Sequence, residues 1–258
     1  KKLAEVLSDA TPFTSSLTSL RCGSNPIKDE GMAVLLDAVK DVALIEFDIA
    51  NTEIGPPTAK KLAEVLSDAT PFTASVAHID ISEAIIGDAS HALVEAVKSS
   101  SCLESITIAK GVKLPLKGQY DSDIFDAAKK GIESGDAALI AWWLTTPVTS
   151  SLTLLSIAAN PIGADGANAL LEAVKLSTTL KALDIGKPLP LQENFDSDAL
   201  DLSQTDMGPG QVVILSWWLT TSFSASIKVI NLSKCPLTGA TKNYEGEWEN
   251  IDSDMTGF

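Results

Sequence analysis

The 258-residue sequence contains few of the residues from which catalytic and metal centres are usually built, with 3 cysteines and 2 histidines. The cysteines Cys22, Cys102 and Cys235 are odd in number, widely spaced and without a CxxC pair. This argues against a disulfide framework or a zinc site and favours a reducing compartment such as the cytoplasm. The motifs GxSxG, GxGxxG, HExxH and the phosphate-binding P-loop are also missing. We therefore expect a protein that is not an enzyme and that has no cofactor and no metal ion.

Long apolar runs and positive charge are scarce as well. No run approaches the roughly 20 apolar residues that a membrane-spanning helix needs. Lys and Arg together number 19 against 34 Asp and Glu, which gives a net charge of −15. Such a chain repels nucleic acid and favours partners with a basic or neutral surface. The sequence also starts without an initiator methionine or a signal peptide, in the middle of an apparent helix, so we expect a segment of something longer.

Two kinds of repeat stand out against this background. The segment KKLAEVLSDATPFT occurs at residues 1–14 and again, unchanged, at residues 60–73, a spacing of 59. The pattern LxxLxLxxNxL occurs at Leu17–Ile27 and Leu152–Ile162, and Ile227–Leu237 follows it with Cys235 at the Asn position. The segment Gly163–Lys175, which follows one of these matches, has apolar residues at helical spacing. Each repeat unit therefore predicts one strand followed by one helix.

This pattern resembles the leucine-rich repeat, in particular the ribonuclease-inhibitor type with units of 27 or 28 residues. The resemblance implies an α/β solenoid, curved like a horseshoe, with a parallel sheet on the concave side and helices on the convex side. Stacking is needed because one unit cannot bury its apolar face alone. We expect a single solenoid over residues 1–258 that continues as a longer array. The Asn of each unit is expected to hydrogen-bond backbone groups that would otherwise be buried and unpaired.

Nine strands of one continuous parallel sheet are predicted from pairs of apolar residues at alternate positions. The pairs are Leu20/Cys22, Phe47/Ile49, Ile79/Ile81, Ile106/Ile108, Phe125/Ala127, Leu155/Ile157, Leu183/Ile185, Leu200/Leu202 and Ile230/Leu232. Proline-containing loops at Lys113–Gln119 and Pro188–Asn194 are expected to bulge from the array in place of helices, and Pro236–Asp254 starts the same pattern a third time.

Acidic clusters precede two of the strands. Asp121, Asp123 and Asp126, and likewise Asp196, Asp198 and Asp201, offer carboxylates of the kind that calcium prefers. The spacing lacks the Gly and the distal Glu of an EF-hand loop, so we favour a role in turn formation.

Paired tryptophans occur at 142–143 and 217–218. Neighbouring helix residues point about 100° apart, so both rings of a pair cannot face the core. When the helical segments AEVL (63–66) and AWWL (141–144) are aligned, Trp142 takes the position of Glu64 and Trp143 that of Val65. The second ring either covers the adjacent proline loop or, as Trp142 and Trp217, forms a patch for a partner.

The strongest candidate for a binding surface is the exposed side of the strands. The residue between the two apolar positions is aspartate in five of the nine strands, although strands disfavour aspartate. We call these residues the strand-face aspartates: Asp48, Asp80, Asp126, Asp184 and Asp201. Small residues follow two positions later, so an open acidic groove is expected. The same aspartates would also be expected if their role were only to keep a bare sheet face soluble.

The function expected from these features is a non-catalytic protein-interaction or scaffold module. Two alternatives remain open at this stage. One is a structural building block that packs into a larger assembly or filament, and the other is a calcium-dependent adhesive segment.

Overall fold

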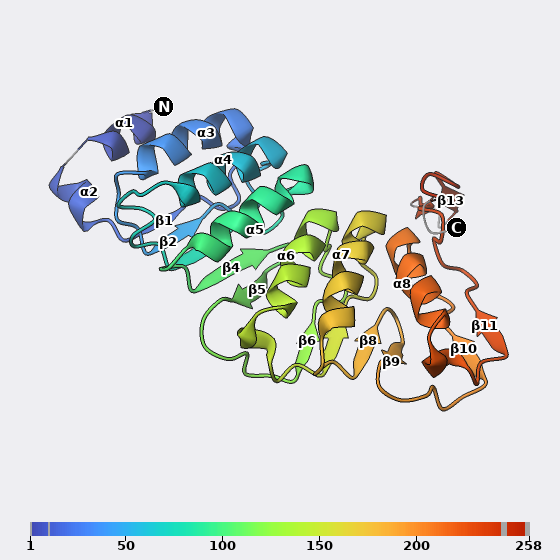
Figure 1. The fold of residues 1–258 in the computed structure, drawn as a ribbon. Coiled ribbons are helices and arrows are strands. Elements are labelled where there is room, and N and C mark those ends of the chain that lie inside the picture. Colours follow the sequence, from blue (N-terminus) through green and yellow to red (C-terminus); the bar gives the residue numbers. More distant parts are fainter. Residues whose placement is uncertain (1, 10, 244–246, 256–258) are drawn as a thin grey trace. The chain divides into compact units, whose positions relative to one another are not determined.

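The computed structural model describes residues 2–9, 11–243 and 247–255, and it is a mixed α/β fold in which short strands alternate with helices (Figure 1). The chain forms two compact units, Lys1–Gly118 and Gln119–Phe258. Within each unit, helices that follow one another in the sequence pack side by side: α3 against α4 and α4 against α5 in the first, α6 against α7 and α7 against α8 in the second.

The first unit begins with two short helices and continues with strands and helices in turn. Its elements are α1 (Lys2–Ser8), α2 (Pro12–Ser16), β1 (Ser19–Arg21), α3 (Lys28–Val39), β2 (Glu46–Asp48), α4 (Pro56–Ser67), β3 (His78–Asp80), the 3-10 turn η1 (Gly87–Ala89), α5 (Ser90–Ser99), β4 (Ser105–Ile108) and β5 (Val112–Pro115).

The second unit follows the same alternation. Its elements are β6 (Ile124–Asp126), α6 (Ser134–Leu144), η2 (Pro147–Thr149), β7 (Leu154–Ser156), α7 (Gly163–Leu176), β8 (Ala182–Asp184), β9 (Pro188–Pro190), β10 (Ala199–Asp201), α8 (Pro209–Leu219), η3 (Ser222–Ser224), β11 (Val229–Asn231), β12 (Thr241–Lys242) and β13 (Trp248–Glu249).

All nine strands predicted from the apolar pairs are present, as β1–β4, β6–β8, β10 and β11. Seven of the nine pairs, from Phe47/Ile49 to Leu200/Leu202, are buried, because alternate strand residues point to the same side of a sheet and here meet the apolar faces of the helices. In the first and last strands, Leu20 is partly exposed and Ile230 is 38% exposed. The helix predicted at Gly163–Lys175 is α7.

The prediction of one continuous parallel sheet is wrong. In the described part of the chain the strands form a five-stranded sheet (β1-β2-β3-β4-β5), a four-stranded sheet (β6-β7-β8-β9) and two two-stranded sheets (β10-β11 and β12-β13). Consecutive repeat strands within one sheet pair in parallel, but β5 runs antiparallel to β4, and β9 runs antiparallel to β8.

The two antiparallel strands lie where proline loops were expected to bulge from the array. At the first, Ala109 and Gly111 have positive φ and reverse the chain within three residues, so that Leu114 comes to lie opposite Ile106. Leu114 and Leu189 are fully buried, and this burial holds both hairpins against their sheets. As expected, neither segment forms a helix.

The turns after several of the strands confirm the role expected for the Asn position. Buried Asn160 donates hydrogen bonds to the carbonyls of Ala127, Ile157 and Ala158, and it accepts two from backbone N–H groups of the preceding repeat. Where Thr52 takes this position, its hydroxyl donates to the Ile49 carbonyl at 2.7 Å. These side chains pair backbone groups that would otherwise be buried without a partner.

Candidate functional site

The strand-face aspartates occupy equivalent positions, since each is the last residue of its strand, in β2, β3, β6, β8 and β10. Asp126 and Asp201 are exposed, and the other three are partly exposed. None of the ion pairs formed within the described residues includes any of the five. Their charges are therefore balanced by solvent and by more distant groups.

The structure brings two of these aspartates directly together. Asp48 and Asp80 face each other in register on the parallel strands β2 and β3. In the second unit, Ser156 on β7 lies between Asp126 and Asp184, and Asp201 is in register with the neutral Asn231. Like charges on adjacent strands repel each other, so the Asp48/Asp80 pair is the most strongly acidic point of the row.

Each strand-face aspartate also has a structural role that the sequence analysis missed. In all five, Oδ1 accepts a hydrogen bond from the backbone N–H two residues later, at 2.9–3.0 Å. Asn231 forms the same contact with the N–H of Ser233 at 3.1 Å. This local turn explains why aspartate is tolerated at the end of a strand. The repeated spacing of aspartate and a small residue two positions later was the available signal.

The second carboxylate oxygen, Oδ2, is left for other contacts at Asp48, Asp80 and Asp126 among the described residues. Among the described residues, Oδ2 of Asp48 and Oδ2 of Asp80 accept no hydrogen bond, whereas Oδ2 of Asp184 accepts one from the Ser156 hydroxyl at 2.9 Å. At Asp201, the backbone N–H and the hydroxyl of Ser203 lower the pKa of the carboxyl group. These contacts favour the charged form of Asp201.

A glycine beside Asp48 leaves room for the carboxylate of this aspartate. A Cβ atom at Gly23, in the repeat before Asp48, would lie 3.0 Å from Oδ1 of that aspartate. A larger residue at Gly23 would therefore press on the carboxylate. The row of small residues noted in the sequence thus has a steric explanation at this position.

Positive charge flanks the acidic pair on both edges of the first sheet. Arg21 is in register with Asp48, but its guanidinium donates to Glu46, which raises the pKa of Arg21 and lowers that of Glu46. Exposed Lys113 on β5 is in register with Thr107 on the other side. The acidic surface is therefore narrower than the continuous groove predicted from sequence, and its centre is Asp48 and Asp80.

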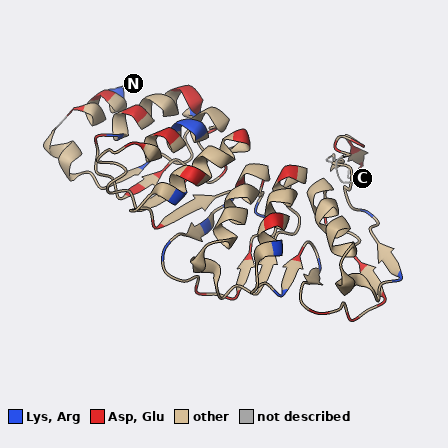
Figure 2. Ribbon diagram, in the orientation of Figure 1, with Lys and Arg blue, Asp and Glu red and all other residues tan. Residues whose placement is uncertain are grey.

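The tryptophan pairs divide as predicted between the core and the surface. Trp143 and Trp218 are fully buried, whereas Trp142 and Trp217 are partly exposed. The Trp218 indole donates to the Pro190 carbonyl at 2.7 Å, so this buried ring anchors the strand β9. Helices α6 and α8 carry almost no charge, in contrast to α3, α4, α5 and α7 (Figure 2). Trp142 and Trp217 thus remain candidates for a second, apolar contact surface.

In the segments that contain the acidic clusters before β6 and β10, the serines and a backbone carbonyl form the contacts at the start of each strand. Ser122 accepts a hydrogen bond from the Ile124 N–H, and Ser197 accepts one from the Ala199 N–H. The Asp123 carbonyl accepts from Leu154, which ties the cluster to the next repeat. Within the described residues, no three His, Cys, Asp or Glu side chains are grouped so that they could hold a metal ion.

Two further findings concern the chain as a whole. None of the helices in the described ranges is long and apolar enough to cross a membrane. No known protein-family model matches the sequence, and no curated protein sequence matches it either.

Proposed function

We propose that this chain is a leucine-rich-repeat solenoid and that it works as a non-catalytic module that binds a partner protein. The proposal is supported by the strand–turn–helix period, by the nine strands at the predicted positions and by the Asn160 contacts between neighbouring repeats. Repeats of this kind present a row of equivalent side chains, and such a row suits recognition of an extended surface.

The binding surface that we propose is the strand face centred on Asp48 and Asp80. The observation that carries it is the register of these two carboxylates on adjacent strands, with no ion pair to either among the described residues. Their Oδ1 atoms maintain the local turns, and their Oδ2 atoms are available to a ligand. A partner segment rich in Lys and Arg relieves the repulsion between the two charges and associates faster at low salt.

The test replaces both aspartates by asparagine. Asn231 already forms the same turn contact with Ser233, so Asp48→Asn with Asp80→Asn removes charge without removing the structural hydrogen bonds. We expect a Lys- and Arg-rich peptide to bind the double variant about fivefold more weakly than it binds the parent chain, the effect of losing two exposed ion pairs.

The matched control changes two exposed glutamates on helices of the same unit, Glu30→Gln with Glu64→Gln, and so alters the net charge equally. Equal loss of binding in both double variants would mean that the peptide senses only the net charge. Unchanged binding in the aspartate variant would reject this face as the site.

A further inference from the structure

The two identical segments differ in burial, although their sequences do not. We call residues 1–14 the first copy and residues 60–73 the second copy. Three large apolar side chains are about half exposed in the first copy and buried in the second. The exposed fractions are 50%, 47% and 52% for Leu3, Val6 and Phe13, against 1%, 0% and 0% for Leu62, Val65 and Phe72.

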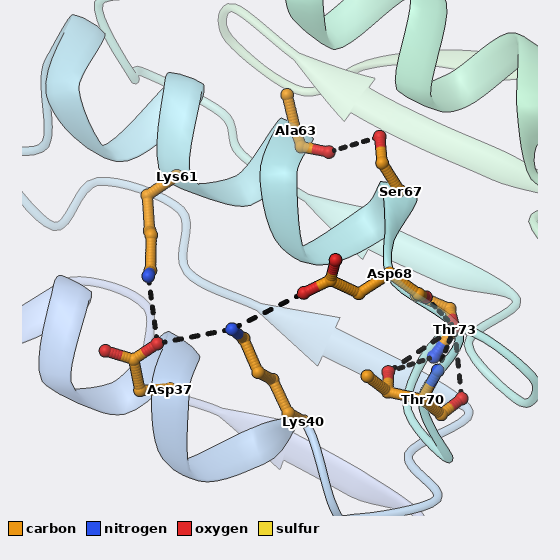
Figure 3. Close-up of polar contacts among 8 residues, drawn as sticks. All are labelled: Asp37, Lys40, Lys61, Ala63, Ser67, Asp68, Thr70 and Thr73. Atoms are coloured by element: carbon orange, nitrogen blue, oxygen red, sulfur yellow. Dashed lines mark hydrogen bonds and ion pairs between the residues drawn. The ribbon is translucent and has the colours of Figure 1, made fainter.

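Local structure does not explain this difference, because the internal contacts of the two copies agree. The Ser8 hydroxyl donates to the Ala4 carbonyl at 2.9 Å, and Ser67 donates to Ala63 at 2.8 Å. The mutual contacts of Thr11 and Thr14 are repeated by Thr70 and Thr73, with the two N–H···Oγ1 distances agreeing within 0.1 Å (Figure 3). The described residues of the first copy therefore already form the same local side-chain contacts as the second copy, although residues 12–16 form the helix α2 and residues 71–75 form a turn.

The contacts that cover the second copy come from the residues before it. The Phe72 ring packs edge-on against the Phe47 ring of β2, with centroids 5.6 Å apart. The backbone N–H of Phe72 donates a hydrogen bond to the Lys40 carbonyl at 3.1 Å. Figure 3 shows two ion pairs at the same boundary: Lys61 with Asp37 at 2.9 Å, and Lys40 with Asp68 at 3.5 Å. The unit that precedes the second copy thus supplies the Phe47 ring, the Asp37 carboxylate and the Lys40 ammonium group.

The first copy carries the same charged residues as the second copy, but they form none of the ion pairs described above. Lys2 and Asp9 stand where the second copy has Lys61 and Asp68, and neither side chain forms an ion pair with any described residue. Both copies are followed by a packed helix, since α1 contacts α3 and α4 contacts α5. The uncovered side of the first copy is therefore the side that a preceding unit covers in the second.

We infer that the face formed by Leu3, Val6 and Phe13, with Lys2 and Asp9 at its border, is a docking surface for one further strand–helix unit with the chemistry of residues 28–48. That unit presents an aromatic ring at the position of Phe47, a carboxylate at that of Asp37 and a cation at that of Lys40. This inference does not depend on the strand-face aspartates.

A second copy of the chain fits this surface less well. Its last strand–helix unit consists of α8 and β11, and with Gly210 aligned on Gly31 it has Ser216 and Leu219 at the positions of Asp37 and Lys40. Neither residue can pair with Asp9 or Lys2. Charge complementarity therefore favours a unit of the 28–48 type over self-association.

The experiment duplicates residues 1–59 ahead of Lys1, so that the first copy gains the same predecessor as the second. A single reporter thiol is introduced in a background with Cys22→Ala, Cys102→Ala and Cys235→Ala. Val6→Cys and Val65→Cys are matched reporters, because both change a valine to a residue of similar size in identical local sequence. Maleimide labelling rates are compared in the parent and the extended chain.

In the parent chain we expect Val6→Cys to label fast and Val65→Cys to label slowly. In the extended chain, Val6→Cys should slow by about tenfold or more, as the burial of one large apolar group predicts. The control carries Phe47→Ala and Asp37→Lys in the added block only, and fast labelling of Val6→Cys should return.

Three outcomes would overturn the inference. The first is labelling of Val6→Cys in the extended chain as fast as in the parent. The second is slow labelling in the parent at high protein concentration together with a dimer in sedimentation, which would make a second copy the occupant. The third is fast labelling of Val65→Cys in the extended chain, because the added block would then have disrupted the fold that it should extend.

Discussion

The side-chain amide of Asn160 donates a hydrogen bond to the carbonyl of Ala127, 33 residues earlier in the chain, at 2.7 Å. Asn160 is buried, and its contacts join two consecutive repeats of the second unit through their turns. This one side chain satisfies backbone groups on both sides of the boundary.

Replacing Asn160 by alanine should therefore strongly destabilise the fold. Asn160→Ala leaves several buried backbone groups without partners, and we expect the free energy of unfolding to fall by about 3 kcal/mol or more. Thr205→Val is the control, since Thr205 has the equivalent position with a single backbone contact, to the Leu202 carbonyl, and should cost about 1 kcal/mol. All five tryptophans follow residue 118, so urea denaturation monitored by tryptophan fluorescence reports on this unit. Equal losses in the two variants would contradict the role assigned to Asn160.

Asp29 gives a prediction about pH. Burial raises the pKa of this carboxyl group, but hydrogen bonds from the Thr58 hydroxyl and from the N–H groups of Gly55 and Thr58 outweigh it, and the net pKa is lowered. A lowered pKa in the folded state stabilises the protein above the unfolded value, about 3.9. This contribution is lost as the pH falls through the lower folded value.

We therefore expect Asp29→Asn to reduce the acid sensitivity of the first unit below about pH 4. Circular dichroism follows unfolding of the whole chain, and tryptophan fluorescence follows the second unit alone, because residues 1–118 include no tryptophan; an acid transition seen only by circular dichroism therefore belongs to the first unit. Asp88→Asn is the matched control, since this exposed carboxylate accepts no hydrogen bond from the described residues. An acid transition that shifts equally in both variants would show that Asp29 has no special part in it.

Much of the fold could be predicted because it depends on local periodicity. The alternation of apolar residues located every repeat strand, and the helical spacing after Leu152–Ile162 located α7. The hairpins at β5 and β9 could not be predicted in this way. The first depends on the positive φ of Ala109, a residue type that gives no sign of such a conformation, and both depend on tertiary burial, of Leu114 in one and Leu189 in the other.

The candidate site was predicted in position but not in its contacts. The sequence placed Asp48 and Asp80 on the exposed side of adjacent strands, and they lie there in register. It did not reveal that Oδ1 of each aspartate is used by its own backbone, because that contact depends on the turn after the strand. Nor did it place Lys113 beside β4 in the same sheet, because residues 113–119 were expected to form a loop and instead begin with the antiparallel strand β5.

The buried tryptophan of the second pair gives a further prediction. Trp218→Phe keeps an aromatic ring beside Phe195 but removes the donor to the Pro190 carbonyl, and we expect a loss of about 1–2 kcal/mol. Trp217→Phe, in the partly exposed neighbour, should change stability by about 0.5 kcal/mol or less. Urea denaturation monitored by circular dichroism measures both. A larger effect at Trp217 than at Trp218 would reverse the assignment of core and surface.

The most direct test of the proposed function is the salt dependence of binding. The affinity of a Lys- and Arg-rich peptide is measured across a series of salt concentrations, for the parent chain and for Asp48→Asn with Asp80→Asn. If the strand face is the site, affinity for the parent falls steeply with salt, and the double variant gives a shallower slope, because two charges no longer take part. The same slope in both proteins would contradict binding at Asp48 and Asp80.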